Sequence, residues 1–237
     1  MRTNGYSQIP VIEDNEVLGV FSYRSFAQAA AHASLTEWTA QKCAPGDLPV
    51  DEFIEQFDYF RVTEEMSRVF DAMDRDNGVL IGTPERLVGI LTPMDFLRYL
   101  YQVASPFVMV WEIELALRAL IRSAMTPEQI ALASQRALAK IYDGIDNVPT
   151  FLEDMTFENY RSLIANGDNF PQFEAIFGGG RVRTSAKLKE IGHIRNDLFH
   201  FRREITIQDH QTLTGHRDWL LNKIKQTEAR RRIRNAT

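Results

Sequence analysis

The 237-residue chain has 44% hydrophobic and 25% charged residues, a composition typical of a soluble globular protein with one large domain or two. Its charge is uneven: residues 1–106 hold 8 basic against 16 acidic side chains, whereas residues 181–237 hold 14 against 6. The basic region favours a polyanionic partner, while its terminal run 230–234 taken alone is better explained as a solvated helix end. The single cysteine, Cys43, excludes a disulfide framework, and the lack of a leader or an uninterrupted apolar span predicts a cytoplasmic protein that crosses no membrane.

The first 106 residues contain an internal repeat of strands and helices. Residues 9–12 and 17–21 predict two strands, and Ser22 can cap a helix over residues 23–33. The pattern returns about 70 residues later, where residues 79–81 and 87–91 predict strands and Thr92 precedes a helix from Pro93. Residues 34–52 connect the two copies. A repeat of this kind predicts a paired domain.

Residues 1–103 resemble a pair of CBS domains, and residues 89–95, Gly-Ile-Leu-Thr-Pro-Met-Asp, carry the resemblance most specifically. The resemblance implies an adenine nucleotide (AMP, ADP or ATP) as a regulatory ligand. The resemblance also implies that the Thr92 hydroxyl would contact a phosphate and that the Asp95 carboxylate would contact the ribose hydroxyls. Phe60, Val62 and Thr63 would lie near the base. A helix N-terminus with a hydroxyl also favours an anion. The alternative is that Thr92 and Asp95 only cap the helix.

The first copy departs from this pattern in two ways. Ser25 stands where the second copy has Asp95, so the ribose contact is missing. The copy also starts late, because residues 1–6 can supply only the end of an opening helix. Either the chain is shortened or one half of the pair is degenerate, and at most one nucleotide site per pair is expected.

Residues 104–106, Ala-Ser-Pro, predict a break in the helix and therefore a boundary between domains 1–105 and 106–237. The second domain contains no strand pattern, which predicts an all-helical bundle and an α+β protein overall. The glycines at 178–180 favour a loop over a phosphate cradle, since no strand precedes them and no Gly-Lys-Ser/Thr follows. Helices are expected over residues 107–125, 127–142, 156–165, 173–177, 184–203 and 208–232.

One predicted helix carries an arginine, an amide and an imidazole close together, in the run Arg195–His200. Asn196 and His200 are four residues apart and share a face if the helix continues. With the acidic run 112–118 of the first long helix, this motif resembles HEPN domains, helical modules of which many are metal-independent ribonucleases. The resemblance covers about residues 107–227.

The HEPN resemblance implies a homodimer in which two motifs face each other across an RNA substrate. His200 would act as general acid or base, Arg195 would bind the scissile phosphate, Asn196 would bind a phosphate oxygen or orient His200, and Glu114 (or Glu112) would fix Arg195. No metal or other catalytic cofactor is implied. The hypothesis is a toxin- or defence-like endoribonuclease regulated by adenine nucleotide. The alternative is a non-catalytic nucleotide-sensing or RNA-binding dimerisation module.

Overall fold

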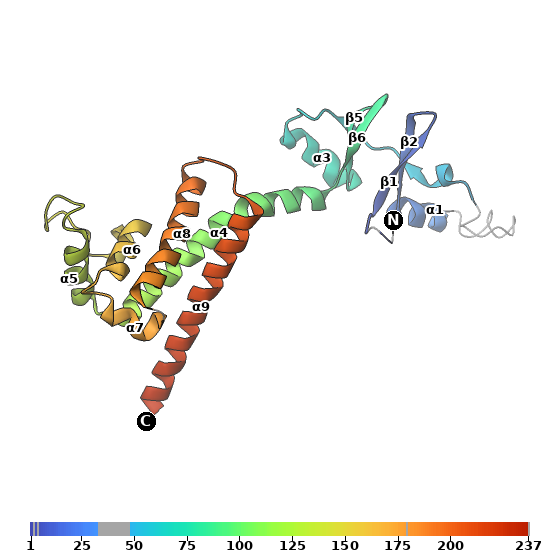
Figure 1. Ribbon diagram of the computed structural model, residues 1–237. Coiled ribbons are helices and arrows are strands. Elements are labelled where there is room, and N and C mark those ends of the chain that lie inside the picture. The colour runs from blue at the N-terminus through green and yellow to red at the C-terminus, as the bar shows by residue number, and fades with distance from the viewer. Residues whose placement is uncertain (2, 4, 33–47, 179, 237) are drawn as a thin grey trace. The chain divides into compact units, whose positions relative to one another are not determined.

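The computed structural model describes residues 1, 3, 5–32, 48–178 and 180–236. The chain divides into two compact units, Met1–Tyr101 and Gln102–Thr237 (Figure 1). The first contains small sheets and helices and the second contains helices only among its described residues, so the α+β class is confirmed. Most of the predicted connection at residues 34–52, together with Cys43, lies outside the described residues.

The first sheet of the N-terminal unit has the order β1-β2-β3. Strands β1 (Gln8–Glu13) and β2 (Glu16–Ser22) form an antiparallel hairpin, and β3 (Ile54–Glu55) pairs with β2. Both turn residues of the hairpin, Asp14 and Asn15, have left-handed backbone conformations (φ of 49° and 68°), as a tight turn between twisted strands requires. Helix α1 (Tyr23–His32) follows β2 directly, as predicted from Ser22.

The second sheet has the order β4-β5-β6. Strand β4 (Tyr59–Phe60) runs parallel to β5 (Val79–Thr83), which pairs antiparallel with β6 (Arg86–Leu91). Helix α3 (Met66–Asp76) lies between β4 and β5 in the chain. The buried side chains of Val20, Phe57 and Leu80 form one apolar cluster, so the two copies of the repeat share a core.

The helical unit is built around α4 (Pro93–Ala124), whose later residues lie in a large apolar cluster. In Figure 1, α6 lies between α5 and α8, and α9 runs beside α8. Thr126 and Thr156 form capping boxes at the starts of α5 and α6, as their sequences predict. The other helices are α5 (Pro127–Leu138), α6 (Phe157–Ala165), α7 (Pro171–Phe177), α8 (Arg181–Phe199) and α9 (Ile207–Ala236), with short 3₁₀ turns at Val50–Phe53 and Leu152–Asp154.

The predicted helix break at residues 104–106 is wrong, because α4 continues through Pro106. A proline inside a helix costs roughly 3 kcal/mol. Burying one large apolar side chain contributes about 1.5–3 kcal/mol, and α4 buries several after the proline, including Val110, Ile113, Leu117 and Ile121. Tertiary packing therefore outweighs the local signal, and the division between the compact units falls inside α4 rather than at a break.

Helix α8 also differs from its predicted bounds of 184–203. It begins at Arg181, and the buried Thr184 hydroxyl donates to the Gly180 carbonyl (3.2 Å) instead of capping the helix. The helix ends at Phe199, because Phe201 adopts a left-handed conformation (φ of 50°). The Arg202 N–H then donates to the Asp197 carbonyl (3.0 Å), which is the hydrogen bond of a Schellman ending.

Candidate functional site

The first candidate site is the turn between β6 and α4. The Thr92 hydroxyl and N–H both donate to Asp95 Oδ2, at 2.6 and 3.1 Å. Asp95 Oδ1 lies 3.7 Å from Arg98, and the Asp95 side chain is 45% exposed. The two predicted residues are therefore adjacent and accessible at the start of a long helix. Their mutual hydrogen bonds also match the capping alternative, so this geometry is compatible with either role.

The residues predicted near the base take different positions. Phe60 packs against the same apolar cluster as Leu91 and Phe96, which flank the Thr92–Asp95 turn. Val62 is 73% exposed and Thr63 is also exposed. Among the described residues, no hydrogen bond or ion pair joins Phe60–Thr63 to Thr92 or Asp95. Phe60 therefore packs against the apolar core, whereas the side chains of Val62 and Thr63 are accessible to a ligand.

The corresponding turn of the first copy contains a carboxylate that the sequence did not reveal. The Ser22 hydroxyl donates to Glu55 Oε1 (2.6 Å), and the Arg24 guanidinium donates to Glu55 Oε2 (2.6 and 3.2 Å). Ser22 and Ser25 are both buried and hydrogen-bonded to each other. A phosphate at this turn would face the Glu55 charge. The sequence around Ser22 could not predict this contact, because Glu55 reaches the turn only through the pairing of β3 with β2.

The second candidate site is the Arg195 region of the helical unit. Glu114 Oε1 lies 3.6 Å from Arg195 Nε, and Glu114 Oε2 lies 3.7 Å from Arg118. Glu112 instead faces Arg217 at 3.5 Å, so of the two predicted acids it is Glu114 that faces Arg195. The buried Arg195 Nε has no hydrogen-bond partner among the described residues, because 3.6 Å is too long for a hydrogen bond.

One contact with an aromatic ring and one with an amide also orient the Arg195 side chain. Its guanidinium lies 4.8 Å from the centre of the Phe199 ring, and Arg195 Nη1 donates to Asn196 Oδ1 (3.3 Å). Phe199 in turn packs edge-on against Phe107 on α4 at 5.4 Å. A guanidinium held on an aromatic face keeps its outer nitrogens available for an anion. The cation is thus positioned without being enclosed.

His200 is the C-terminal cap of α8 rather than a residue inside the helix, and it is exposed. Its side chain makes none of the hydrogen bonds or ion pairs found among the described residues. The next residue, Phe201, is 82% exposed and has the strained left-handed backbone described above. Strain of this kind at a bulky residue costs about 1–3 kcal/mol and is found most often at functional sites.

A network around Arg203 anchors the segment that follows His200. The Arg203 guanidinium donates to Asp197 (2.8 Å) and, through two nitrogens, to Asp209 (2.6 and 3.1 Å). The Thr206 N–H and hydroxyl both donate to Asp209 (2.8 Å each). The sequence predicted a helix from residue 208 but gave no signal for the Arg203 contacts. The Arg203 hydrogen bonds, followed by those from Thr206, hold the pKa of Asp209 well below its ordinary value.

This lowered pKa gives the first prediction. A carboxylate with a lowered folded-state pKa contributes stability that is complete above its ordinary pKa of about 3.9 and is lost as the pH falls. Asp209→Asn is therefore expected to lower the urea midpoint of unfolding at pH 7. The midpoint of the variant should also fall less steeply than that of the wild type as the pH drops below about 4. The control is Asp218→Asn, an exposed carboxylate paired with Arg217 on the same helix. Identical pH profiles for wild type and Asp209→Asn would contradict the assignment.

The CBS domain family model matches residues 1–32, which form β1, β2 and α1. No curated protein matches the sequence. The CBS part of the resemblance is thus confirmed at the N-terminal end. The match falls on the first copy, whereas residues 89–95 in the second copy carried the resemblance most specifically. The helical unit is compatible with a helical C-terminal domain, and its HEPN assignment stays a prediction. None of the described helices is long and apolar enough to cross a membrane.

Proposed function

We propose that this chain is a regulatory protein whose N-terminal unit binds an adenine nucleotide. The observation that carries the proposal is the Thr92–Asp95 turn, an accessible hydroxyl and carboxylate at the start of α4, in a unit whose first residues match the CBS domain. The turn would hold a phosphate at the helix N-terminus and the ribose hydroxyls at Asp95. The Glu55 carboxylate at the corresponding turn of the first copy supports one site per pair.

Helix α4 provides a route from this site to the helical unit. It begins at the Thr92–Asp95 turn, and its residues Met109, Ile113, Leu117 and Ile121 belong to the helical core. A nucleotide can bias the helical unit only if it binds two states of the protein with different affinities. Rearranging the Thr92–Asp95 hydrogen bonds on binding would change the first turn of α4 and supply that difference.

The nucleotide site predicts the effect of Asp95→Asn, which keeps the shape of the side chain but removes its charge. Affinity for AMP, measured by calorimetry on the full chain, is expected to fall about 10-fold or more, since hydrogen bonds to a charged group contribute about 1.5–3 kcal/mol. Asp74→Asn, an exposed carboxylate on α3, is the matched control. Equal affinity of both variants, or no binding of AMP, ADP or ATP by the wild type, would rule out this site.

A second candidate function concerns the helical unit, which we propose is a metal-independent endoribonuclease of the HEPN type. The observation that favours it is the Glu114–Arg195 pair, with the exposed His200 five residues after Arg195 in the chain. Arg195 would bind the scissile phosphate and Asn196 would contact a phosphate oxygen. His200 would relay the proton of the 2′-hydroxyl, which attacks the phosphorus, to the 5′-oxygen, which leaves as a hydroxyl when its bond to phosphorus breaks. The exposed Phe201 ring offers a surface on which an RNA base can stack. Cleavage of generic RNA with and without AMP or ATP tests both the activity and its regulation.

This mechanism needs two copies of the motif, and α4 carries a surface suited to a homodimer. Val108, Trp111 and Leu115 occur at helical spacing and are 50%, 60% and 42% exposed, which places an apolar stripe on one face. Exposed stripes of this kind mark interaction surfaces more often than isolated exposed residues do. We propose that this stripe forms the dimer contact.

The dimer surface predicts that Trp111→Glu will raise the dimer dissociation constant at least about 30-fold, the effect of losing about 2 kcal/mol from a central aromatic contact. Sedimentation velocity over a range of concentrations measures this. Leu132→Glu places the same charge on an exposed apolar position of α5 (53% exposed) and is the control. A wild-type monomer at all concentrations, or dissociation by both variants alike, would contradict the assignment.

A further inference from the structure

The helical unit contains a pocket of about 380 Å³ that is lined by none of the residues of the two candidate sites. It lies between the end of α7, the first turns of α8 and the middle of α9. Its volume falls within the range of small-ligand sites. Its lining residues are Phe177, Gly178, Arg183, Thr184, Lys187, Trp219, Asn222, Lys223 and Gln226.

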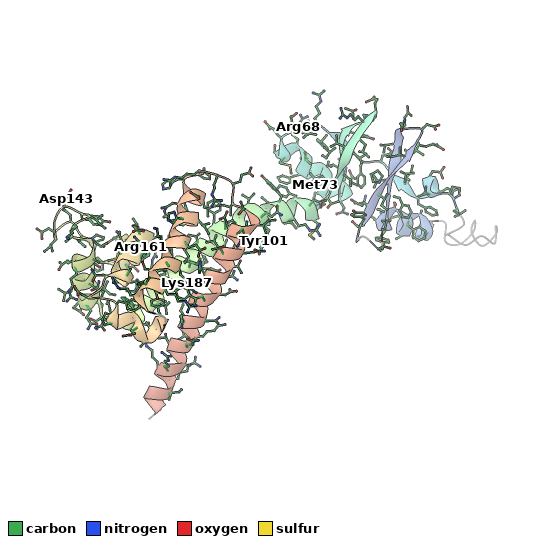
Figure 2. The ribbon with its side chains drawn as sticks, viewed as in Figure 1. Arg68, Met73, Tyr101, Asp143, Arg161 and Lys187 are labelled. Carbon is green, nitrogen blue, oxygen red and sulfur yellow. The ribbon has the colours of Figure 1, made fainter. Side chains whose placement is uncertain are left out.

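The helical spacing of these residues explains why they meet. Arg183 and Lys187 are one turn apart on α8, and the α9 residues 219, 222, 223 and 226 follow the i, i+3, i+4, i+7 pattern of a single helix face. Helices α8 and α9 pack against each other, and Figure 2 shows Lys187 on the part of α8 that runs beside α9. Three cationic side chains therefore converge on one cavity from two helices.

These cations are concentrated without neutralising partners. Among the described residues, Arg183, Lys187 and Lys223 take part in none of the ion pairs. The Glu190 carboxylate acts on Lys187, but Glu190 is itself hydrogen-bonded to His216 at 2.8 Å. Burial, followed by the charges of Arg183 and Lys223, lowers the pKa of Lys187. Like charges gathered in this way repel one another, and a bound anion would relieve that repulsion.

The aromatic wall of the pocket fixes one of the three cations. Lys187 Nζ lies 4.5 Å from the centre of the Trp219 ring, and Trp219 also packs against Phe177 at 5.5 Å. The indole thus holds the ammonium group at the cavity wall by a cation–π contact. The Asn222 and Gln226 side chains add amide donors from α9.

We propose that this pocket binds a small anion carrying two or more phosphate groups, such as pyrophosphate or a nucleoside diphosphate. Three cations that form no ion pair with the described residues match the charge of a diphosphate, and the amides can donate to its remaining oxygens. The concentration of these cations in one pocket fits a compact ligand better than a nucleic acid, which needs cations spread along a track. The site lies wholly within the helical unit and is separate from the Thr92–Asp95 turn, so it stands independently of the proposed nucleotide sensor.

The test uses the full chain and inorganic pyrophosphate, which has no adenosine for the N-terminal site to recognise. Binding is measured by calorimetry and by tryptophan fluorescence. The fluorescence change that disappears in Trp219→Phe is the part that comes from the tryptophan in the pocket. Lys187→Gln/Lys223→Gln is expected to weaken binding at least about tenfold. Lys189→Gln/Lys225→Gln removes the same two charges two residues further along each helix, at exposed positions, and is expected to change affinity less than about twofold.

Several results would overturn the proposal. They are no pyrophosphate binding by the wild type at millimolar concentration, equal losses in the two double variants, or a loss caused by Asp95→Asn instead. Binding of a single-stranded RNA decamer through Lys187 and Lys223 when pyrophosphate does not bind would replace the small ligand with a nucleic acid. Circular dichroism establishes that each variant is folded. Because AMP binding is assessed separately with Asp95→Asn, failure here leaves the proposed sensor unaffected.

Discussion

Replacing either Arg195 or His200 with alanine is expected to reduce RNA cleavage by the purified protein about 10²–10⁴-fold. His200→Ala removes the group proposed to move a proton, and Arg195→Ala removes the cation proposed to stabilise the extra charge of the transition state. Arg195 is the more constrained of the two, because Glu114 and the Phe199 ring hold it in place. His200 sits at an exposed helix end, where a bound substrate would have to order it.

The surrounding sequence offers matched controls for both substitutions. His193→Ala removes an exposed imidazole from the same helix, and Arg202→Ala removes an exposed guanidinium next to the motif. Both are expected to retain cleavage within about threefold, as surface substitutions away from a reacting group do. Arg195→Lys keeps the charge but loses the planar, forked guanidinium, so its rate of RNA cleavage should lie between those of the wild type and Arg195→Ala. Single-turnover assays with EDTA present measure the chemical step.

The opposite results have a clear meaning. If Arg195→Ala and His200→Ala cleave RNA as fast as the wild type, the Glu114–Arg195 pair is a structural feature of the bundle. If the folded wild type never cleaves RNA, the helical unit is better described as a non-catalytic dimerisation or RNA-binding module under nucleotide control. Growth arrest on overproduction of the wild type, but not of His200→Ala, would support the effector role in cells.

Local signals were sufficient to predict most elements of this fold. The helices that follow Ser22, Thr126 and Thr156 begin within one residue of their predicted starts, because capping depends on residues within one turn. The short apolar runs likewise predicted the hairpin strands of both copies. Glu114 and Arg195 were paired through the HEPN resemblance, and the structure brings them to 3.6 Å. Their catalytic roles remain predictions.

The features that escaped prediction depend on contacts between distant residues. Pro106 stays inside α4 because the residues after it are buried against other helices. Helix α8 stops before His200 because Phe201 is left-handed, a conformation for which phenylalanine gives no signal. The Glu55 carboxylate reaches Ser22, at the turn between β2 and α1, from 33 residues away. The cationic pocket is lined by residues from both α8 and α9. None of these follows from spacing within a single element.

Glu114→Ala is expected to lower the free energy of unfolding of the helical unit by about 2–3 kcal/mol. Glu114 lies between Arg118 and Arg195, and the side chains of all three are only 21–26% exposed. Removing the carboxylate leaves two partly buried guanidinium groups facing each other, and breaking a fully buried ion pair costs about 3–5 kcal/mol. Partial exposure reduces that figure through solvent screening. Urea unfolding followed by circular dichroism measures the change.

A double-variant comparison separates repulsion from simple loss of contact. Glu114→Ala/Arg195→Ala removes one of the two facing cations, so its cost is expected to be smaller than the sum of the single changes by about 1 kcal/mol. Glu112→Ala is the matched control, because its partner Arg217 is 31% exposed and Glu112 itself 36%, and it should cost less than about 1 kcal/mol. Equal costs for Glu112→Ala and Glu114→Ala would show that Glu114 has no special position. If Glu114→Ala instead slows RNA cleavage at a temperature where it is fully folded, the carboxylate positions Arg195 for the reaction as well as stabilising the bundle.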